Sequence, residues 1–110
     1  MAEEPSKETI EKVFEAIEVA KATGKIKKGT NEVTKAIEKG TAKLVAVASD
    51  INPPEIIMHI PLLAEEKGIK CIKVTNKEEL GAAAGLQVGT SAVAVTTEGE
   101  AKDLIKELSD

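Results

Sequence analysis

Apolar residues recur along this chain with two different spacings. Between residues 6 and 22 they fall three or four positions apart, which is the period of an amphipathic helix. This stripe comprises Ile10, Val13, Phe14, Ile17 and Ala20. Residues 44–48 are instead continuously apolar, as is typical of a strand buried on both faces. We therefore expect a first helix, which Ser6 can cap, and a central strand.

Shorter segments of both kinds alternate over the rest of the chain. Further strands are expected at 25–28, 71–74 and 91–96. Further helices are expected at 30–39, 53–67, 77–84 and around Leu104 to Leu108. This alternation predicts one α/β domain over residues 1–110, with helices on both faces of a small mixed sheet of about four strands. The lysine-rich strand 25–28 is suited to the edge of that sheet.

Local signals mark where several of these helices begin and end. Asn52 and Asn76 each precede a glutamate by three residues, which is a capping arrangement. Helix stops are expected at Gly40, Gly68 and Gly85. Pro61 should kink its helix or interrupt the hydrogen-bond ladder.

The segment 28–40 combines a helix start with a strongly polar face. Thr30 is a plausible N-cap after the permissive Gly29, and the apolar side of the helix repeats from Val33. Asn31 and Lys35 share the opposite side. Because a helix N-terminus carries positive partial charge, this segment is suited to bind phosphate.

Charge is distributed unevenly along the chain. Residues 25–43 contain six lysines against Glu32 and Glu38, a local charge of +4 in a chain of net charge −4, so the remainder carries −8. Such asymmetry marks one face for an anionic partner, although a solvated helix face with i,i+4 ion pairs explains it equally well. The chain has no Arg, Trp or Tyr, so recognition must come from lysines, amides, carboxylates and backbone groups.

Composition also bears on compartment and cofactors. The single cysteine, Cys71, excludes an internal disulfide and suits a reducing cytoplasm, and we expect its strand to be buried. The acidic N-terminus is not a signal peptide, and no apolar run is long enough to span a membrane. We expect no metal or other cofactor, because the lone His59 and the distant cysteine do not form a ligand set.

Motifs for nucleotide binding and catalysis are not supported. The segment 24–30 begins like a phosphate-binding P-loop but has Thr30 where the loop needs lysine. The glycines of 81–85 do not stand at a strand-to-helix turn, so they are expected to permit close packing and a helix stop rather than bind a dinucleotide. No serine has a histidine–acid pair, and we expect that the protein is not an enzyme.

Asn31 and Glu32 allow two interpretations on chemistry alone. A carboxylate accepts hydrogen bonds from the imino and amino groups of guanine, and an amide can pair with base edges. Alternatively, Glu32 simply favours the positive end of its helix.

Three blocks of this sequence resemble the archaeal kink-turn-binding ribosomal protein family L7Ae. They are Gly29–Gly40 (GTNEVTKAIEKG), Pro53–Leu63 (PPEIIMHIPLL) and Lys77–Gly85 (KEELGAAAG), in the family's order and spacing. The resemblance spans roughly residues 10–97. It implies a three-layer α-β-α sandwich that binds kink-turn RNA, a bent helix with tandem sheared G·A pairs and one extruded nucleotide.

The resemblance also implies roles for individual residues. Asn31 and Glu32 would contact the guanines of the G·A pairs, and Lys35 would support them. The backbone at Gly29 and Thr30 would approach phosphates. The remaining contacts implied are Asn52, Ile56 and Lys77 around the extruded base, and Leu86, Gln87 and Val88 as a second contact loop. We expect the two aliphatic side chains of this loop to be exposed, and they would cover bases. Together these give the expected RNA-binding set of Lys28, Gly29, Thr30, Asn31, Glu32, Lys35, Asn52, Ile56, Lys77, Leu86, Gln87 and Val88.

Members of this family act in the archaeal large ribosomal subunit, as the core protein of box C/D and H/ACA guide RNA particles, and in the tRNA-processing ribonuclease P. The resemblance therefore implies these RNAs and other ribonucleoprotein proteins as partners, and we expect a cytoplasmic protein that is a monomer when free. One alternative is a related accessory kink-turn protein with no ribosomal role. A small α/β enzyme or a protein-interaction domain is the alternative of a different class.

Overall fold

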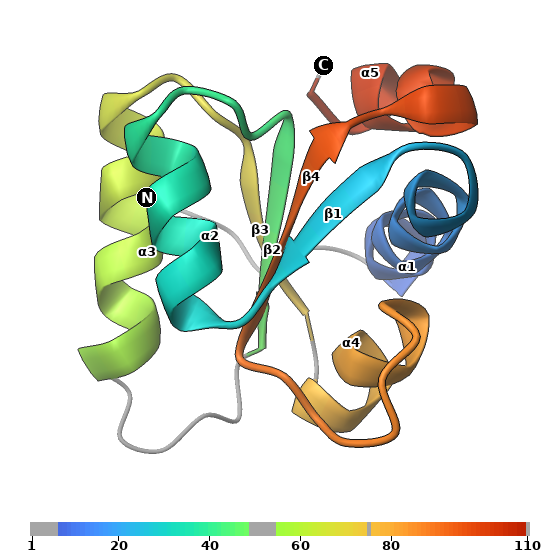
Figure 1. The fold of residues 1–110 in the computed structure, drawn as a ribbon, viewed down its shortest axis with the longest axis horizontal. Coiled ribbons are helices and arrows are strands. Elements are labelled where there is room, and N and C mark those ends of the chain that lie inside the picture. Colours follow the sequence, from blue (N-terminus) through green and yellow to red (C-terminus); the bar gives the residue numbers. More distant parts are fainter. Residues whose placement is uncertain (1–6, 49–54, 75, 110) are drawn as a thin grey trace.

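Strands and helices alternate along the part of the chain that the computed structural model describes (Figure 1). That part comprises residues 7–48, 55–74 and 76–109, with the side chains of 55–58 and 109 excepted. The elements in chain order are α1 (Lys7–Thr23), β1 (Lys25–Lys28), α2 (Thr30–Glu38), β2 (Leu44–Ala48), α3 (Glu55–Glu66), β3 (Cys71–Val74), α4 (Lys77–Ala83), β4 (Ala92–Thr97), the 3-10 turn η1 (Gly99–Ala101) and α5 (Lys102–Ser109).

The four strands form one mixed sheet in the order β1-β4-β2-β3. β4 is antiparallel to both of its neighbours, β1 and β2, whereas β2 and β3 are parallel. Consequently β1, β2 and β3 run in the same direction. Their C-terminal ends and the N-terminal end of β4 meet at one end of the sheet, drawn at the bottom of Figure 1, which we call the lower end.

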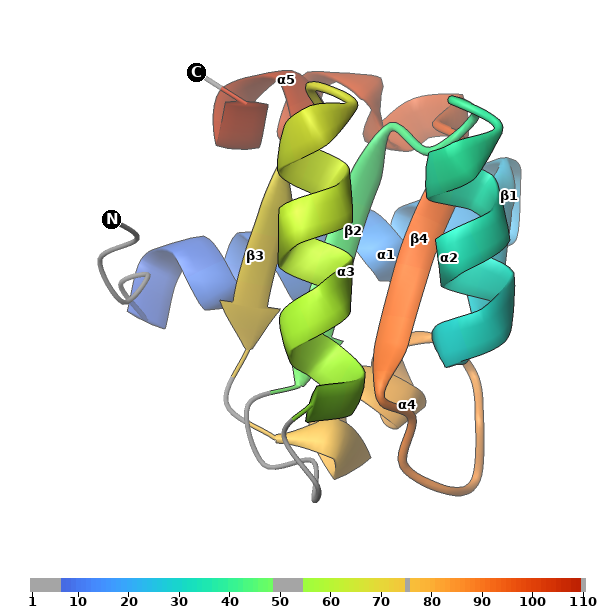
Figure 2. The ribbon, with the colours of Figure 1, turned by 90° about the vertical axis from the view of Figure 1, so that its left-hand side faces the viewer.

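Helices cover both faces of the sheet, as the sequence predicts. α2 and α3 lie side by side on one face, and α1, α4 and α5 lie on the other (Figures 1 and 2). β2 joins the two layers because its side chains alternate between faces. Leu44 and Ala46 pack in the cluster beneath α1 and α4, while Val45 and Val47 pack in the cluster beneath α2 and α3. The prediction that this strand is buried on both faces is confirmed.

Most of the expected helix boundaries are confirmed to within a residue or two. Gly40, Gly68 and Gly85 follow helices and have positive φ angles of 72°, 70° and 82°. The side chain of Asn76 accepts a hydrogen bond from the backbone N–H of Glu79 at 2.7 Å, so it caps α4. α3 continues through Pro61 to Glu66, so the proline does not end the helix. The capping predictions for Ser6 and Asn52 fall outside the described residues.

Two sequence expectations about β3 and α2 need correction. We expected Cys71 to lie in a buried strand, but β3 is an edge strand and Cys71 is half-buried beside the α2–α3 cluster. Thr30 is not the N-cap of α2: Gly29 occupies that position with a φ of 94°, and no side chain caps the helix. Glycine adopts this conformation without strain, so the helix starts one residue earlier than the threonine signal suggested.

No helix within the described residues is long and apolar enough to cross a membrane.

Candidate nucleic-acid interface

The start of α2 is an exposed polar surface on a well-packed helix. Val33 and Ile37 are fully buried against the sheet. On the other side, Asn31, Glu32 and Lys35 are exposed to solvent. The amphipathic pattern predicted for residues 30–39 is confirmed, and it leaves an amide, a carboxylate and an ammonium group at the lower end.

Gly29 connects this helix to the sheet. Its N–H donates to the carbonyl of Ala92 at 2.9 Å, and its own carbonyl accepts from Val33 at 3.0 Å. A side chain at this position would meet no atom within 4 Å, so the backbone of Gly29 faces open space. A phosphate can therefore approach the first turn of α2 closely.

The hydroxyl of Thr30 contacts a residue that sequence analysis did not single out. Its Oγ1 lies 2.6 Å from the Oγ of Ser91, and both residues are half-buried. The carbonyl of Thr30 also accepts from the hydroxyl of Thr34 at 2.7 Å. Ser91 was missed because its proximity to Thr30 follows from the pairing of β1 with β4, which no local sequence signal reveals.

The loop 85–90 folds back against α4. The N–H of Leu86 donates to the carbonyl of Gly81 at 2.8 Å, and the N–H of Thr90 donates to the carbonyl of Lys77 at 3.1 Å. A Cβ added at Gly81 would lie 2.1 Å from the carbonyl oxygen of Val88. The expected role of the 81–85 glycines in close packing and a helix stop is therefore confirmed.

The two aliphatic side chains of this loop differ in exposure. Val88 is 71% exposed, as the sequence suggested. Leu86 is half-buried and packs against the core beneath α1, which corrects the expectation that it is exposed. The reason is its backbone bond to Gly81, which turns the loop inward at that point.

The structure brings most of the predicted site residues to the lower end. Lys28, Gly29, Thr30, Asn31, Glu32 and Lys35 lie at the end of β1 and in the first two turns of α2, Lys77 starts α4, and Leu86, Gln87 and Val88 lie in the adjoining loop. Ile56 lies in the first turn of α3, although its side chain is not described, and Asn52 lies outside the described residues. These segments are far apart in sequence and meet because three strands end where β4 begins.

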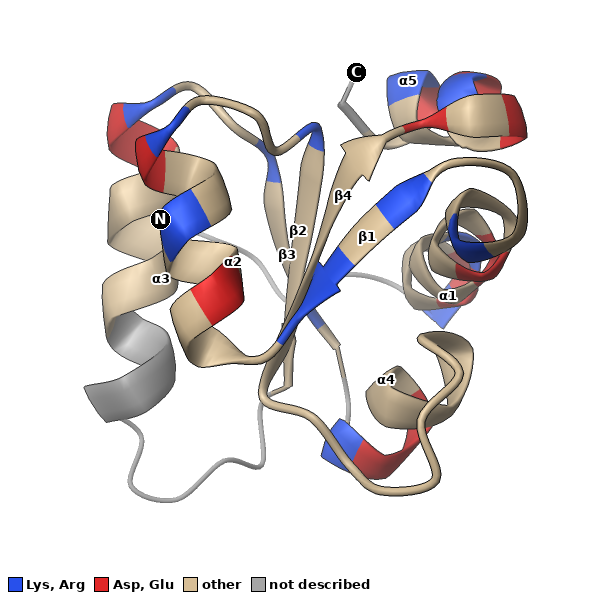
Figure 3. Cartoon of the chain, in the orientation of Figure 1, with Lys and Arg blue, Asp and Glu red and all other residues tan. Residues whose placement is uncertain are grey.

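Lysines border this surface along β1 (Figure 3). All six lysines of residues 25–43 are exposed. Ion pairs between these lysines and nearby glutamates could have explained the charge pattern, but none is formed among the described residues. The salt bridge found there joins Lys12 to Glu107 at 3.2 Å, on the opposite side of the sheet. The lysines are thus available to an anionic partner.

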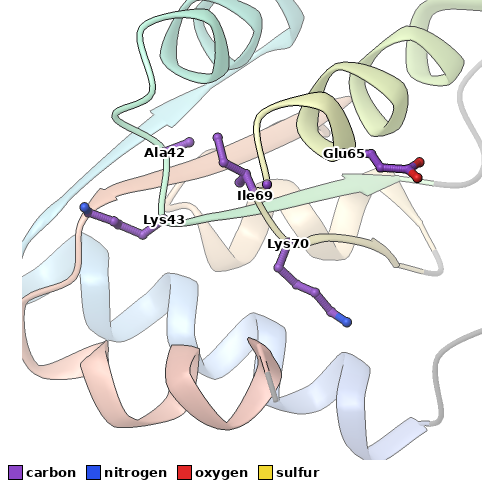
Figure 4. Close-up of a pocket in the computed structure, with 6 residues that line it drawn as sticks. Ala42, Lys43, Glu65, Ile69 and Lys70 are labelled. Carbon is purple, nitrogen blue, oxygen red and sulfur yellow. The ribbon is translucent and has the colours of Figure 1, made fainter.

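Other candidate chemistry lies away from the lower end. The described residues contain no group of three or more side chains able to hold a metal ion, and His59 is exposed on α3. Burial raises the pKa of the Cys71 thiol to about 12 against an opposing effect of Lys73, so this thiol is not activated as a nucleophile. The hollow in Figure 4 lies at the opposite end of the sheet, and its Lys43 and Lys70 extend away from one another.

The fold and this surface define a small α/β domain with a polar helix start, an exposed loop and a basic strand gathered at one end. The family model described as "Ribosomal protein L7Ae/L30e/S12e/Gadd45 family" matches residues 11–105, and the chain belongs to this family. Among solved structures it is similar to the Giardia lamblia 15.5kD RNA binding protein, with a TM-score of 0.90 and 27% sequence identity over 96% of this chain and 88% of that chain. The family model confirms the resemblance at the level of this broader family, and the similar structure confirms the fold class expected from the sequence.

Proposed function

We propose that this protein binds RNA through the lower end and recognises kink-turns there. The observation that carries the proposal is the exposed Asn31–Glu32 pair at the start of α2, which lies at the same end as the exposed Val88 of the neighbouring loop. Membership of the family and the similarity to a protein described as RNA binding support the same assignment.

Each of these side chains suits one feature of a kinked RNA. Glu32 accepts hydrogen bonds from the guanines of the G·A pairs, and Asn31 pairs with a base edge beside it. Lys35, one turn further along α2, binds a phosphate or a guanine acceptor. Bulged RNA is read in this way because its groove opens and its bases are accessible.

The second contact segment supplies apolar cover without an aromatic residue. Val88 lies against an unstacked base, with Leu86 and Gln87 beside it in the loop. Lys77, Asn52 and Ile56 border the extruded nucleotide.

We further propose the cellular role that the sequence resemblance implies. The protein is a structural, non-catalytic component of the archaeal large ribosomal subunit, and a core protein of box C/D and H/ACA guide particles and of ribonuclease P. It acts in the cytoplasm together with other ribonucleoprotein proteins and is a monomer when free. A related accessory kink-turn protein without a ribosomal role is the second candidate, because the same surface serves either task.

A gel-shift titration with two matched RNAs tests the proposal. One RNA contains a standard kink-turn, and the other replaces its G·A pairs with Watson–Crick pairs at the same length and charge. Reading of these pairs should give a preference of at least about fivefold for the kink-turn, since one good base-edge contact is worth ~1–3 kcal/mol. Equal binding of the two RNAs would overturn the assignment.

A further inference from the structure

Residues 90–92 connect three segments of the candidate interface. The N–H of Thr90 donates to Lys77 at the start of α4, at 3.1 Å. The carbonyl of Ser91 accepts from Ala48 at the end of β2, at 2.9 Å, and the carbonyl of Ala92 accepts from Gly29 before α2, also at 2.9 Å. The start of β4 is thus bonded to each strand end or helix start beside it.

These three bonds use backbone atoms, whereas the contact between Ser91 and Thr30 uses side chains. The two hydroxyl oxygens are 2.6 Å apart and half-buried, so one hydroxyl donates to the other in a site partly shielded from water. α2 has no side-chain cap, and it follows a glycine whose backbone is intrinsically permissive. The position of its first turn therefore depends on neighbours such as Ser91.

We propose that Ser91 is a positioning residue of the RNA interface. Its hydroxyl holds Thr30, and with it Asn31 and Glu32, at a fixed offset from the loop that presents Val88. This inference rests on the proposed function, because the offset matters only when α2 and the loop contact the same RNA.

A fixed distance between α2 and the loop matters more for selective hydrogen bonds to bases than for general electrostatic attraction to phosphates. Base-edge hydrogen bonds need placement within about 0.5 Å, and a contact site formed by two segments loses that placement when one segment shifts. Attraction between lysines and phosphates falls off gradually with distance and tolerates such a shift. Removing the hydroxyl of Ser91 should therefore weaken kink-turn binding while leaving binding to plain duplex RNA unchanged.

Variants that remove one of the two hydroxyl groups in this contact test the proposal. Ser91→Ala and Thr30→Val should each lower kink-turn affinity roughly 3- to 10-fold, the range expected for one hydrogen bond. The double variant should lose no more than either single variant, because both remove the same contact. Thr30→Ser retains the hydroxyl and should lose less affinity than Thr30→Val. Thr96→Val is the matched control, since it removes a β4 hydroxyl that bonds to Lys25 at the other end of β1, and it should leave affinity unchanged.

Amide hydrogen exchange in the free protein provides a readout that does not depend on RNA. Ser91→Ala should accelerate exchange at Val33, whose N–H forms the first hydrogen bond of α2. Unchanged exchange at Val33 together with unchanged kink-turn affinity in Ser91→Ala would overturn the inference. Additive losses of affinity in the double variant would also overturn it, because they would show that each hydroxyl contacts RNA separately. If the wild-type protein does not distinguish the two RNAs of the gel shift, the proposed function fails, and exchange at Val33 still decides whether Ser91 holds α2.

Discussion

Glu32 is a carboxylate in the middle of a lysine-rich surface. It is exposed in the first turn of α2 and forms no salt bridge among the described residues. A carboxylate brought against a polyanion is unfavourable unless it accepts hydrogen bonds from donors there. Guanine imino and amino groups are such donors, so this negatively charged residue is the most informative one to change.

Replacing Glu32 with alanine should weaken kink-turn binding by ~1–3 kcal/mol, the value of one good base-edge contact. Binding to the RNA that lacks the G·A pairs should change little. Parallel titrations with both RNAs measure the difference. Glu38→Ala removes another exposed carboxylate from the last turn of the same helix and serves as the control for charge alone. Equal weakening on both RNAs would contradict a role in reading these pairs.

Cys71 provides a prediction about protonation. Burial raises the pKa of its thiol from 9.0 to about 12, so the folded state holds the proton more tightly than the unfolded state. At pH 8 the thiolate population should be about a thousandfold lower in the folded chain. Reaction with a disulfide reagent should therefore be slow in the native protein and fast in urea. The same shift makes the contribution of this residue to stability complete below pH 9 and progressively lost as the pH rises toward 12. Fast native labelling at pH 8 would contradict this environment.

At the scale of secondary-structure elements, two asparagines should differ in their roles, one in folding stability and the other in RNA recognition. Asn76 caps α4, so Asn76→Ala should lower the free energy of unfolding by about 1 kcal/mol. Asn31 is exposed on α2, so Asn31→Ala should change stability by less than about 0.5 kcal/mol while reducing kink-turn affinity. Urea unfolding and RNA titration of both variants measure the two effects. A large loss of stability in Asn31→Ala would show that it has a structural role instead.

Gly81 illustrates a competition between helix propensity and packing. In an ordinary helix interior, glycine to alanine stabilises by roughly 0.5–1 kcal/mol. Here the new Cβ would lie 2.1 Å from the carbonyl oxygen of Val88, and relieving such a contact typically costs about 1–3 kcal/mol. Gly81→Ala should therefore destabilise the protein and displace the Val88 loop, as thermal unfolding and amide chemical shifts would detect. A rise in melting temperature would show that the loop moves away from the new Cβ without a loss of stability.

These elements show what local sequence signals predict and what they do not. The apolar run of β2, the cap at Asn76 and the glycine stops were predictable because each depends on residues within one turn or strand. The N-cap of α2 and the contact between Ser91 and Thr30 were not, because both depend on the pairing of β4 with its neighbours. The inward turn at Leu86 was not predictable either, because it depends on how the loop folds back onto α4. The candidate site itself was found largely through family resemblance, since chemistry alone left Glu32 with two interpretations.

At the scale of the whole molecule, the sheet separates a local excess of lysines from a small excess of acidic residues. β1 and α2 carry four lysines against two glutamates, whereas α1, α4 and α5 in the other layer carry eight acidic residues against six lysines (Figure 3). The molecule measures 33 × 30 × 26 Å, while charges are screened over about 8–10 Å at physiological salt. An RNA at the lower end is therefore attracted by the nearby lysines and is largely insensitive to the net charge of −4.

This separation predicts how affinity depends on salt. Lys35→Ala should reduce the slope of log affinity against log salt concentration by ~0.7–0.9 if its ammonium group neutralises one phosphate. Lys106→Ala removes the same charge from α5, which lies in the other layer at the opposite end of the sheet (Figure 1), and should leave the slope unchanged because an RNA at the lower end does not contact it. Titrations at several salt concentrations with both variants measure the slopes. An equal effect of the two substitutions would mean that overall charge governs binding, and an unchanged slope in Lys35→Ala would assign this lysine to a base contact or to none.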